Sequence, residues 1–296
     1  MKDLLFLIIP VLLLAGCNSS RKSDAGSKEQ SFPTFSLTEM WSTDTTLRTC
    51  ESVLFDESRD LLFVSCINGN PSEKDGNGFI SMVRPDGTIH SLQWVTGLNA
   101  PKGMGVFENK LFVTDIDELV IIDVERAAIS DRIPVEGASF LNDISVSADG
   151  KVYMSDSDSG VLWIYSEGEL TPWITEGLNR PNGLFVEGAR VLLTSSGSQD
   201  LRIIHKATGE TETVTTGIGA GDGVEYTGEE GYYLTSSWAG EIFLIYPDYS
   251  KVSLLKTSDR GINSADIGFN RDDQVVYVPT FSDNRVVAYK LENTSN

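Results

Sequence analysis

The sequence has few of the residues on which several common kinds of site depend. It contains only two histidines and three cysteines in 296 residues, which disfavours a zinc centre of imidazole and thiolate ligands and a Ser-His catalytic triad. It also lacks the G-x-x-x-x-G-K-[ST] and G-x-S-x-G motifs, so we expect neither a P-loop nucleotide site nor a nucleophile elbow. We expect His90 and His205, in outer or third strands of the repeats described below, to be ordinary surface or packing residues.

Positive charge is also scarce. Lys and Arg total 23 against 43 Asp and Glu, which gives a formal net charge of −20. A chain of this charge is repelled by phosphate backbones and anionic lipid surfaces, so nucleic acid is not an expected partner. The hydrophobic content of 40% is enough for one large all-β domain or two smaller ones.

No apolar run is long enough to span a membrane as a helix, which takes about 20 residues. The run from Leu4 to Ala15 follows a single lysine and is typical of a signal peptide, here residues 1–16. "LAGC", ending at Cys17, has the small-residue-then-Cys pattern of the bacterial lipobox. We therefore expect a lipoprotein of the cell envelope, periplasmic or surface facing, that meets the membrane only through a lipid on Cys17; the alternative is an ordinary signal peptide followed by a chance cysteine. The polar residues 17–34 suit a flexible tether.

The rest of the chain repeats one pattern six times. Each repeat has a polar residue, apolar residues two and four places later, a turn and a second apolar run, with most starts about 40 residues apart. Period-two alternation indicates strands, and a repeat of this length with four strands is the size of a propeller blade. The repeats begin at Glu51, Lys102, Asn142, Asn182, Asp222 and Ala265.

The sixth repeat reaches Lys290 after only three strands. The unassigned segment "FSLTEMWSTD" before the first repeat has strand composition and can supply the fourth strand, which would close the ring without a free edge. We therefore predict one all-β domain over residues 35–296: a six-bladed β-propeller with four antiparallel strands per blade, closed by an N-terminal strand near residues 36–43. Five or seven blades fit the count less well.

Cys50 and Cys66 are the cysteines left after the signal region. Strands near residues 51–56 and 61–66 would form a hairpin that places the two roughly opposite each other. Outside the cytoplasm a disulfide would survive, although direct cross-strand bridges are geometrically demanding. A disulfide and two packed thiols therefore both stay open.

The first strand of each blade lines the channel of a propeller, so the six repeat starts should meet around one axis. Five of the six are polar, and the two carboxylates and two carboxamides among them are hard oxygen donors. Such donors favour Ca²⁺, Mg²⁺ or Mn²⁺, although Zn²⁺ also accepts carboxylate oxygen. The alternative to a metal site is a structural role, in which pairs such as Asn182-Gly183 are turn residues at a hydrated channel mouth.

Four short motifs, in order and in blade register, resemble the regucalcin/gluconolactonase family. They are "CESV" at Cys50, "LNDI" at Leu141, "PNGL" at Pro181 and "GDGV" at Gly221. Members of that family are six-bladed propellers that hold one divalent metal in the channel and hydrolyse sugar lactones. The resemblance implies Glu51, Asn182 and Asp222 as metal ligands, Asp222 as the acid/base, and Asn142 as a catalytic and substrate-binding residue. Ca²⁺ is the ion we expect first.

Two positions depart from the family pattern. Regucalcin-like members have an arginine where this chain has Phe140, and Lys102 stands where a small or apolar residue is usual. Lys102 could replace the metal by pairing with Glu51 and Asp222, bind an anionic group of the substrate, or lie solvated at the channel mouth. All three possibilities stay open from the sequence.

The leading hypothesis is therefore a monomeric, metal-dependent hydrolase of a small lactone, sugar derivative or related ester. The loop at residues 67–78 would rim its pocket and could act as a lid. Trp163 and Trp173 should pack between blades, whereas Trp238 is a possible sugar platform. The alternatives are a non-catalytic, membrane-tethered propeller that binds a carbohydrate, peptide or envelope partner, and a strictosidine-synthase-like propeller, which would not need this oxygen set.

Overall fold

The computed structural model describes residues 32–295 of the chain. The expected signal peptide, the lipid-bearing Cys17 and nearly all of the expected tether lie outside these residues. Within them, no helix is long and apolar enough to cross a membrane. The helical structure of this part of the chain is one short 3-10 helix, η1 (Ser258–Arg260).

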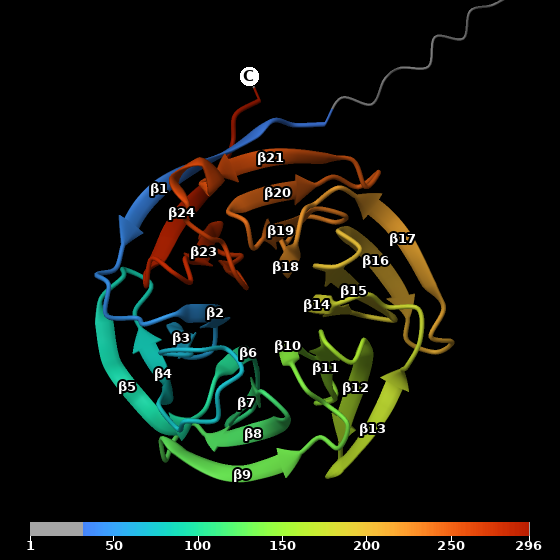
Figure 1. The fold of residues 1–296 in the computed structure, drawn as a ribbon. Coiled ribbons are helices and arrows are strands. Elements are labelled where there is room, and N and C mark those ends of the chain that lie inside the picture. The colour runs from blue at the N-terminus through green and yellow to red at the C-terminus, as the bar shows by residue number, and fades with distance from the viewer. Residues whose placement is uncertain (1–31, 296) are drawn as a thin grey trace, which may run out of the picture. The chain divides into compact units, whose positions relative to one another are not determined.

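The described residues form six sheets of four antiparallel strands, arranged as blades around a central axis (Figure 1). This confirms the predicted six-bladed propeller. The strands of blades one to three, from the axis outward, are β2 (Cys50–Asp56), β3 (Leu61–Cys66), β4 (Gly78–Val83) and β5 (Ile89–Leu98); β6 (Pro101–Phe107), β7 (Lys110–Asp115), β8 (Glu118–Asp123) and β9 (Ala128–Pro134); β10 (Leu141–Val146), β11 (Val152–Asp156), β12 (Val161–Ser166) and β13 (Glu169–Ile174).

The strands of blades four to six, in the same order, are β14 (Pro181–Glu187), β15 (Arg190–Ser195), β16 (Asp200–His205) and β17 (Thr211–Thr216); β18 (Gly221–Tyr226), β19 (Tyr233–Ser237), β20 (Glu241–Ile245) and β21 (Lys251–Lys256); β22 (Gly268–Asn270), β23 (Val275–Pro279), β24 (Val286–Asn293) and β1 (Phe35–Ser42). Each innermost strand contacts the innermost strands of both neighbouring blades, so the ring is continuous around the channel.

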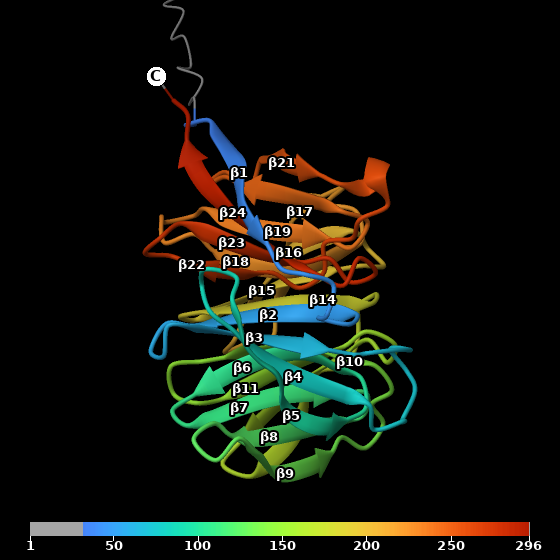
Figure 2. The same cartoon turned by 90° about the vertical axis from the view of Figure 1, so that its left-hand side faces the viewer.

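The sixth blade is completed from the other end of the chain. β1 pairs antiparallel with β24, with Phe35 opposite Asn293 and Ser42 opposite Val287. Figure 2 shows β1 lying along β24 at the edge of the ring. The predicted closing strand near residues 36–43 is therefore confirmed. With β1 as its outermost strand, blade six has four strands like the other five blades.

The hydrophobic core lies in layers between neighbouring blades. One cluster joins Val53 and Leu62 of blade one to Val275 and Tyr277 of blade six, and five similar clusters join the other neighbouring pairs. The middle strands are buried on both faces because a blade lies on each side of them, whereas the outermost strands are mostly exposed. Burial of these layers fixes the tilt of each blade and hence where its inner strand starts.

Several predictions about single residues can be compared with this core. Trp163 and Trp173 pack in the layers between blades, as expected, whereas Trp238 is 44% exposed. Both histidines are exposed, in β5 and β16.

Cys50 lies opposite Cys66 in the β2–β3 hairpin, and both thiols are free and buried. The Cys50 thiol donates to the Arg285 carbonyl at 2.9 Å, and the Cys66 sulfur lies 3.8 Å from the Ser81 hydroxyl. Burial raises the pKa of Cys50 to about 12. Of the two alternatives left open by the sequence, the structure has the packed thiols.

Candidate functional site

The starts of the inner strands meet at one end of the channel, on the face seen in Figure 1. They line a cavity of about 340 Å³ together with loop residues from several blades. All five polar residues of the predicted set lie in its wall: Glu51, Lys102, Asn142, Asn182 and Asp222. The sixth member, Ala265, is completely buried and is not part of the lining. The structure thus brings together residues that are up to 171 positions apart in the chain.

These five residues share a backbone feature that the sequence did not reveal. The pairing register of the inner strand shifts at its start in blades one to five, for example between Pro181 and Leu184 in β14 and between Gly221 and Val224 in β18. Asn182 and Asp222 occupy these irregularities, and the same holds for the strands that carry the other three. A β-bulge turns a side chain away from the regular alternation. Five bulges therefore direct five polar side chains toward the axis.

Asn182 and Gly183 lie in strand β14 rather than in a turn, so the turn interpretation of this pair is wrong. The reason for the glycine is close packing: a Cβ atom at Gly183 would lie 1.9 Å from the carbonyl oxygen of Asp222. Only glycine allows the backbone of Asp222 to approach so closely. Gly183 thereby brings the start of β18 against β14, and Asp222 next to Asn182.

Hydroxyl side chains on the second strands of blades one to five hold the bulged backbone. Ser155 Oγ accepts the Asp143 amide hydrogen at 3.0 Å, and Ser236 Oγ accepts that of Gly223 at 2.8 Å. The Thr194 hydroxyl donates to the carbonyl of Asp222 itself. In the sequence these hydroxyls are visible as a serine or threonine in the second apolar run of nearly every repeat, outside the four short motifs.

Three of the lining residues carry buried oxygen atoms that have no hydrogen-bond partner: Glu51 Oε2, Asn182 Oδ1 and Asp222 Oδ1. All three side chains are at most 6% exposed. Burial raises the pKa of Glu51 well above its usual value, and the nearby negative charge of Asp222 raises it further. Burial likewise raises the pKa of Asp222, against a hydrogen bond from Asn182 that lowers it. Buried acceptors without partners are costly and rare, so this cluster needs a cation or proton.

Lys102 does not supply that cation. Its ammonium donates to the Ala100 carbonyl at 3.1 Å and lies 4.4 Å from the centre of the Phe140 ring. Within residues 32–295, no carboxylate oxygen lies within 4.0 Å of this nitrogen. Burial lowers the pKa of Lys102, while the charge of Glu51 raises it. The side chain is 1% exposed, so Lys102 is neither an ion-pair partner of the two acids nor a solvated lysine at the rim.

The remaining wall was not predicted from the motifs. On one side Ile67 and Pro71, from the loop after β3, adjoin Trp238 and Phe281, whose rings meet edge to face with centres 5.8 Å apart. The loop after β3 extends beyond the strand ends (Figure 2). Arg180 lies on another part of the rim and pairs with Asp158 at 2.6 Å.

Arg180 places a guanidinium on the cavity rim, although the position of Phe140 has no arginine. It precedes Asn182 by two residues, just as Phe140 precedes Asn142 by two, so both occupy the same register position in neighbouring blades. Both line the cavity. The pocket therefore has an arginine on its rim, one blade further along the ring.

The donor set fits a divalent cation. The three partnerless oxygens come from two carboxylates and one carboxamide, which are ligands that Ca²⁺ and Mg²⁺ prefer, with water in the remaining positions. Residues 32–295 contain no cluster of three or more His, Cys, Asp or Glu side chains suited to a metal. A site here would therefore depend on the carboxamide of Asn182 as its third ligand. Glu51, Asn182 and Asp222 are the residues that would hold the ion.

Comparison with known proteins identifies the fold. Solved structures that superpose on the chain include virginiamycin B lyase from Staphylococcus aureus with quinupristin, at 14% identity and a TM-score of 0.63, covering 87% of this chain and 99% of the lyase. They also include a gluconolactonase from Xanthomonas campestris, at 15% identity and a TM-score of 0.62, covering 86% of this chain and 87% of that one. The likeness is one of fold. No family model and no curated protein matches the sequence.

Proposed function

We propose that this chain is a divalent-metal-dependent hydrolase of a lactone or a related ester. One observation carries the proposal: the oxygens of Glu51, Asn182 and Asp222 that lack partners are buried in the wall of a single cavity. The sequence motifs singled out the same three residues, and a gluconolactonase is among the proteins with this fold.

Each residue has a distinct part in the proposed reaction. A bound divalent ion would polarise the substrate carbonyl and lower the pKa of a water molecule. Asp222 would accept the proton of the attacking water, because its buried carboxylate lies in the wall of the same cavity. Asn142 donates from Nδ2 to the Ser157 hydroxyl at 3.1 Å, which fixes its amide at the cavity wall where it can orient the substrate.

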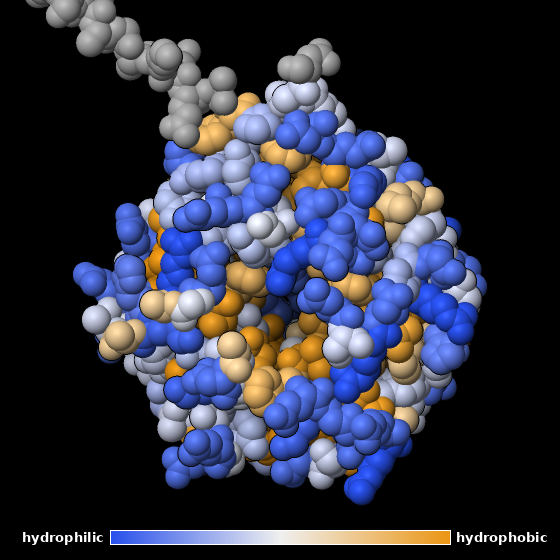
Figure 3. Space-filling view, turned by 180° about the vertical axis from the view of Figure 1, so that it is seen from behind, coloured by the Kyte–Doolittle hydropathy of each residue, from blue (hydrophilic) through white to orange (hydrophobic). Residues whose placement is uncertain are grey.

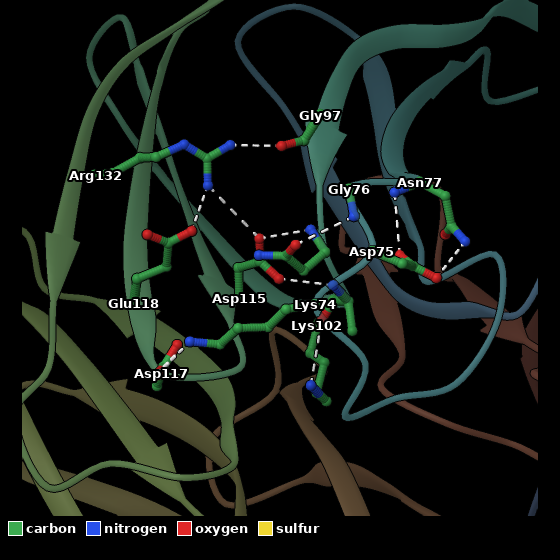
Figure 4. Close-up of polar contacts among 12 residues, drawn as sticks. Lys74, Asp75, Gly76, Asn77, Gly97, Lys102, Asp115, Asp117, Glu118 and Arg132 are labelled. Carbon is green, nitrogen blue, oxygen red and sulfur yellow. Dashed lines mark hydrogen bonds and ion pairs between the residues drawn. The ribbon is translucent and has the colours of Figure 1, made fainter.

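The loop between β3 and β4 can control access to this cavity. Lys74 in the loop pairs with Asp117 of blade two at 2.6 Å, and the Gly76 amide donates to the Asn99 side chain at 3.2 Å (Figure 4). Both contacts are exposed and join the loop to its neighbouring blade by few bonds. Opening of the loop is therefore compatible with an intact ring.

A second candidate function is a non-catalytic binding module held at the cell envelope by Cys17. The observation that favours it is Trp238, whose ring is 44% exposed beside the cavity and could stack on a carbohydrate. Such a module would not need the partnerless oxygens of Glu51 and Asp222. The two functions therefore differ in whether the protein binds a divalent ion.

The test uses the purified protein after removal of metals with a chelator. Calorimetric titration with Ca²⁺, Mg²⁺, Mn²⁺ and Zn²⁺ should reveal one site, and hydrolysis of gluconolactone or butyrolactone should depend on the ion that binds. Asp222→Ala and Asn182→Ala should each reduce both affinity and turnover by about a hundredfold or more, because each removes a ligand. Asp248→Ala, which removes an exposed acid on a surface turn, is the control. Absence of any bound ion, or unchanged turnover in both variants, would reject the proposal.

A further inference from the structure

Lys102 has hydrogen-bonding capacity that the described protein does not use. An ammonium group has three N–H donors, and Lys102 donates one of them, to the Ala100 carbonyl at 3.1 Å. Its other close neighbour is the face of the Phe140 ring, 4.4 Å away. The side chain is 1% exposed and lines the 340 Å³ cavity. A buried cation with unused donors in a cavity wall is placed to receive an anionic acceptor from a ligand.

The position of Lys102 is held by a chain of polar contacts (Figure 4). Asp115 accepts the backbone amide hydrogens of Ala100 at 2.7 Å and Asn99 at 2.8 Å, which fixes the carbonyl that Lys102 contacts. Asp115 is itself completely buried and lies 3.8 Å from Arg132. These contacts pre-organise the ammonium, so a ligand need not order it on binding.

The sum of charges in the cavity indicates the charge of the ligand. The two acids, Glu51 and Asp222, carry −2 when ionised, a divalent ion would carry +2, and Lys102 adds +1. With metal bound, as the proposed function requires, the ion and these three side chains carry one positive charge in excess; this sum covers the wall of the cavity and leaves out Asp143 and Asp266, which line the opposite mouth of the channel. Arg180 does not change this sum, because it already pairs with Asp158. A ligand with one negative charge would neutralise the site.

The rest of the wall indicates an apolar group on the same ligand. Trp238 and Phe281 form an edge-to-face pair, and Ile67 and Pro71 adjoin them around the cavity. Such a surface offers few hydrogen bonds to a polyhydroxylated ring and buries apolar area well. It therefore fits an aromatic or aliphatic substituent better than a free sugar.

We propose that the substrate is a lactone or ester that carries a carboxylate, which Lys102 binds, and an apolar group, which lies against Trp238 and Phe281. This inference rests on the proposed function and specifies its substrate class. Lys102 acts as a specificity-determining residue in it: the ammonium binds a group of the substrate that does not react.

Equilibrium binding tests this inference without turnover. Hydrocinnamate and its neutral amide share one apolar group and differ in the carboxylate, and their affinities for the Ca²⁺-loaded protein can be measured by calorimetry. The wild type should bind hydrocinnamate at least about tenfold more tightly than the amide, since hydrogen bonds between charged groups are the strong ones. Lys102→Met should abolish this preference and leave the amide affinity unchanged. Trp238→Ala should weaken both ligands by a similar factor.

Two controls keep the result specific to Lys102. Lys110→Met removes an exposed lysine at the start of β7, away from the cavity wall, and should leave the preference intact. Thermal unfolding and Ca²⁺ titration of each variant show that it is folded and loaded, and loss of a buried cation should leave the Ca²⁺ affinity of Lys102→Met equal or higher. If the variant keeps the preference, the carboxylate binds elsewhere, for example at the metal, and the inference is overturned.

Turnover separates this inference from the proposed function. A butyrolactone that carries a carboxylate should have a kcat/KM at least about tenfold higher than the same lactone with a carboxamide, and Lys102→Met should bring the ratio close to one. Equal hydrolysis of both lactones by the wild type would overturn the substrate class and leave the hydrolase proposal standing. Absence of both Ca²⁺ binding and hydrolysis would reject the hydrolase proposal, and hydrocinnamate binding would still decide whether Lys102 selects carboxylates.

Discussion

The channel contains two groups of buried acids, and comparison of them shows which signal marks a site. Glu51 and Asp222 lie at the cavity, while Asp143 follows Asn142 in β10 and Asp266 lies two residues before β22. Burial raises the pKa of all four. Burial and a raised pKa therefore do not distinguish the two groups.

Hydrogen bonding does distinguish them. Asp143 Oδ1 accepts the amide hydrogen of Ile144, and Oδ2 accepts that of Leu184 in the next blade, both at 2.6 Å. Asp266 Oδ2 accepts the Ser52 hydroxyl at 2.6 Å, and burial, together with the negative charge of Asp266, raises the pKa of Asp143. The Asp143–Asp266 pair joins four blades, whereas Glu51 and Asp222 each retain an oxygen without a partner. Asp143 and Asp266 therefore hold neighbouring blades together, whereas the proposed function makes use of the partnerless oxygens of Glu51 and Asp222.

The two mouths of the channel differ in size. The mouth opposite the cavity is a smaller hollow of about 170 Å³, whose wall combines apolar residues such as Phe55 and Phe185 with Glu225, Asp266 and Arg271. Figure 3, the view onto that face, shows apolar residues around the central hollow. The larger hollow, at the Glu51 mouth, is the one whose wall contains the oxygens without hydrogen-bond partners.

The largest expected effect comes from Asp143. Asp143→Ala leaves two buried backbone amides without acceptors, at about 1–3 kcal/mol each, so the free energy of unfolding should fall by about 4 kcal/mol. Urea denaturation monitored by tryptophan fluorescence measures this change. Asp143→Asn, which keeps one acceptor, should cost less than half as much. A variant as stable as the wild type would show that this pair is not structural.

The pH dependence of stability follows from the raised pKa values. A carboxyl whose pKa is higher in the folded state stabilises the fold below its unfolded pKa, near 4, and this contribution is lost as the pH rises through the folded value. The pKa of Asp266 is raised from 3.8 to about 6, so this residue alone should lower the free energy of unfolding by about 3 kcal/mol as the pH rises through that range. The metal-free protein should therefore be more stable at pH 5 than at pH 8.

Calcium should reverse this trend, because only the ionised carboxylates bind it. Thermal unfolding between pH 5 and pH 8, with chelator and with excess Ca²⁺, measures both slopes. A rise in the stability of the chelated protein toward pH 8 would contradict the assigned directions of the pKa shifts.

The smallest expected effect is a gain in stability. Glu51→Gln removes a carboxylate that repels Asp222, so the metal-free protein at pH 8 should become about 1 kcal/mol more stable while its Ca²⁺ affinity falls. The exposed Glu229→Gln should change neither quantity. Loss of stability in Glu51→Gln would mean that Glu51 is structural, like Asp143.

The sequence predicted the number of blades, the closing strand and the ring of strand starts, because these follow from period-two alternation and from a repeat count that leaves one strand missing. It could not predict the bulges, since register shifts depend on pairing partners. It left a turn open as the reason for Gly183, because the close approach of the Asp222 carbonyl comes from another blade. Likewise Trp238 and Phe281 meet only in three dimensions, 43 residues apart in the chain.

The pairing of β1 with β24 has a consequence for synthesis of the protein. β1 is among the first strands to be made, and its partner is the last, since Phe35 pairs with Asn293. At the usual speed of translation, about 5–20 residues per second, the interval between synthesis of β1 and synthesis of β24 is on the order of tens of seconds. Until then blade six is incomplete, so the ring can close only after β24 has been synthesised.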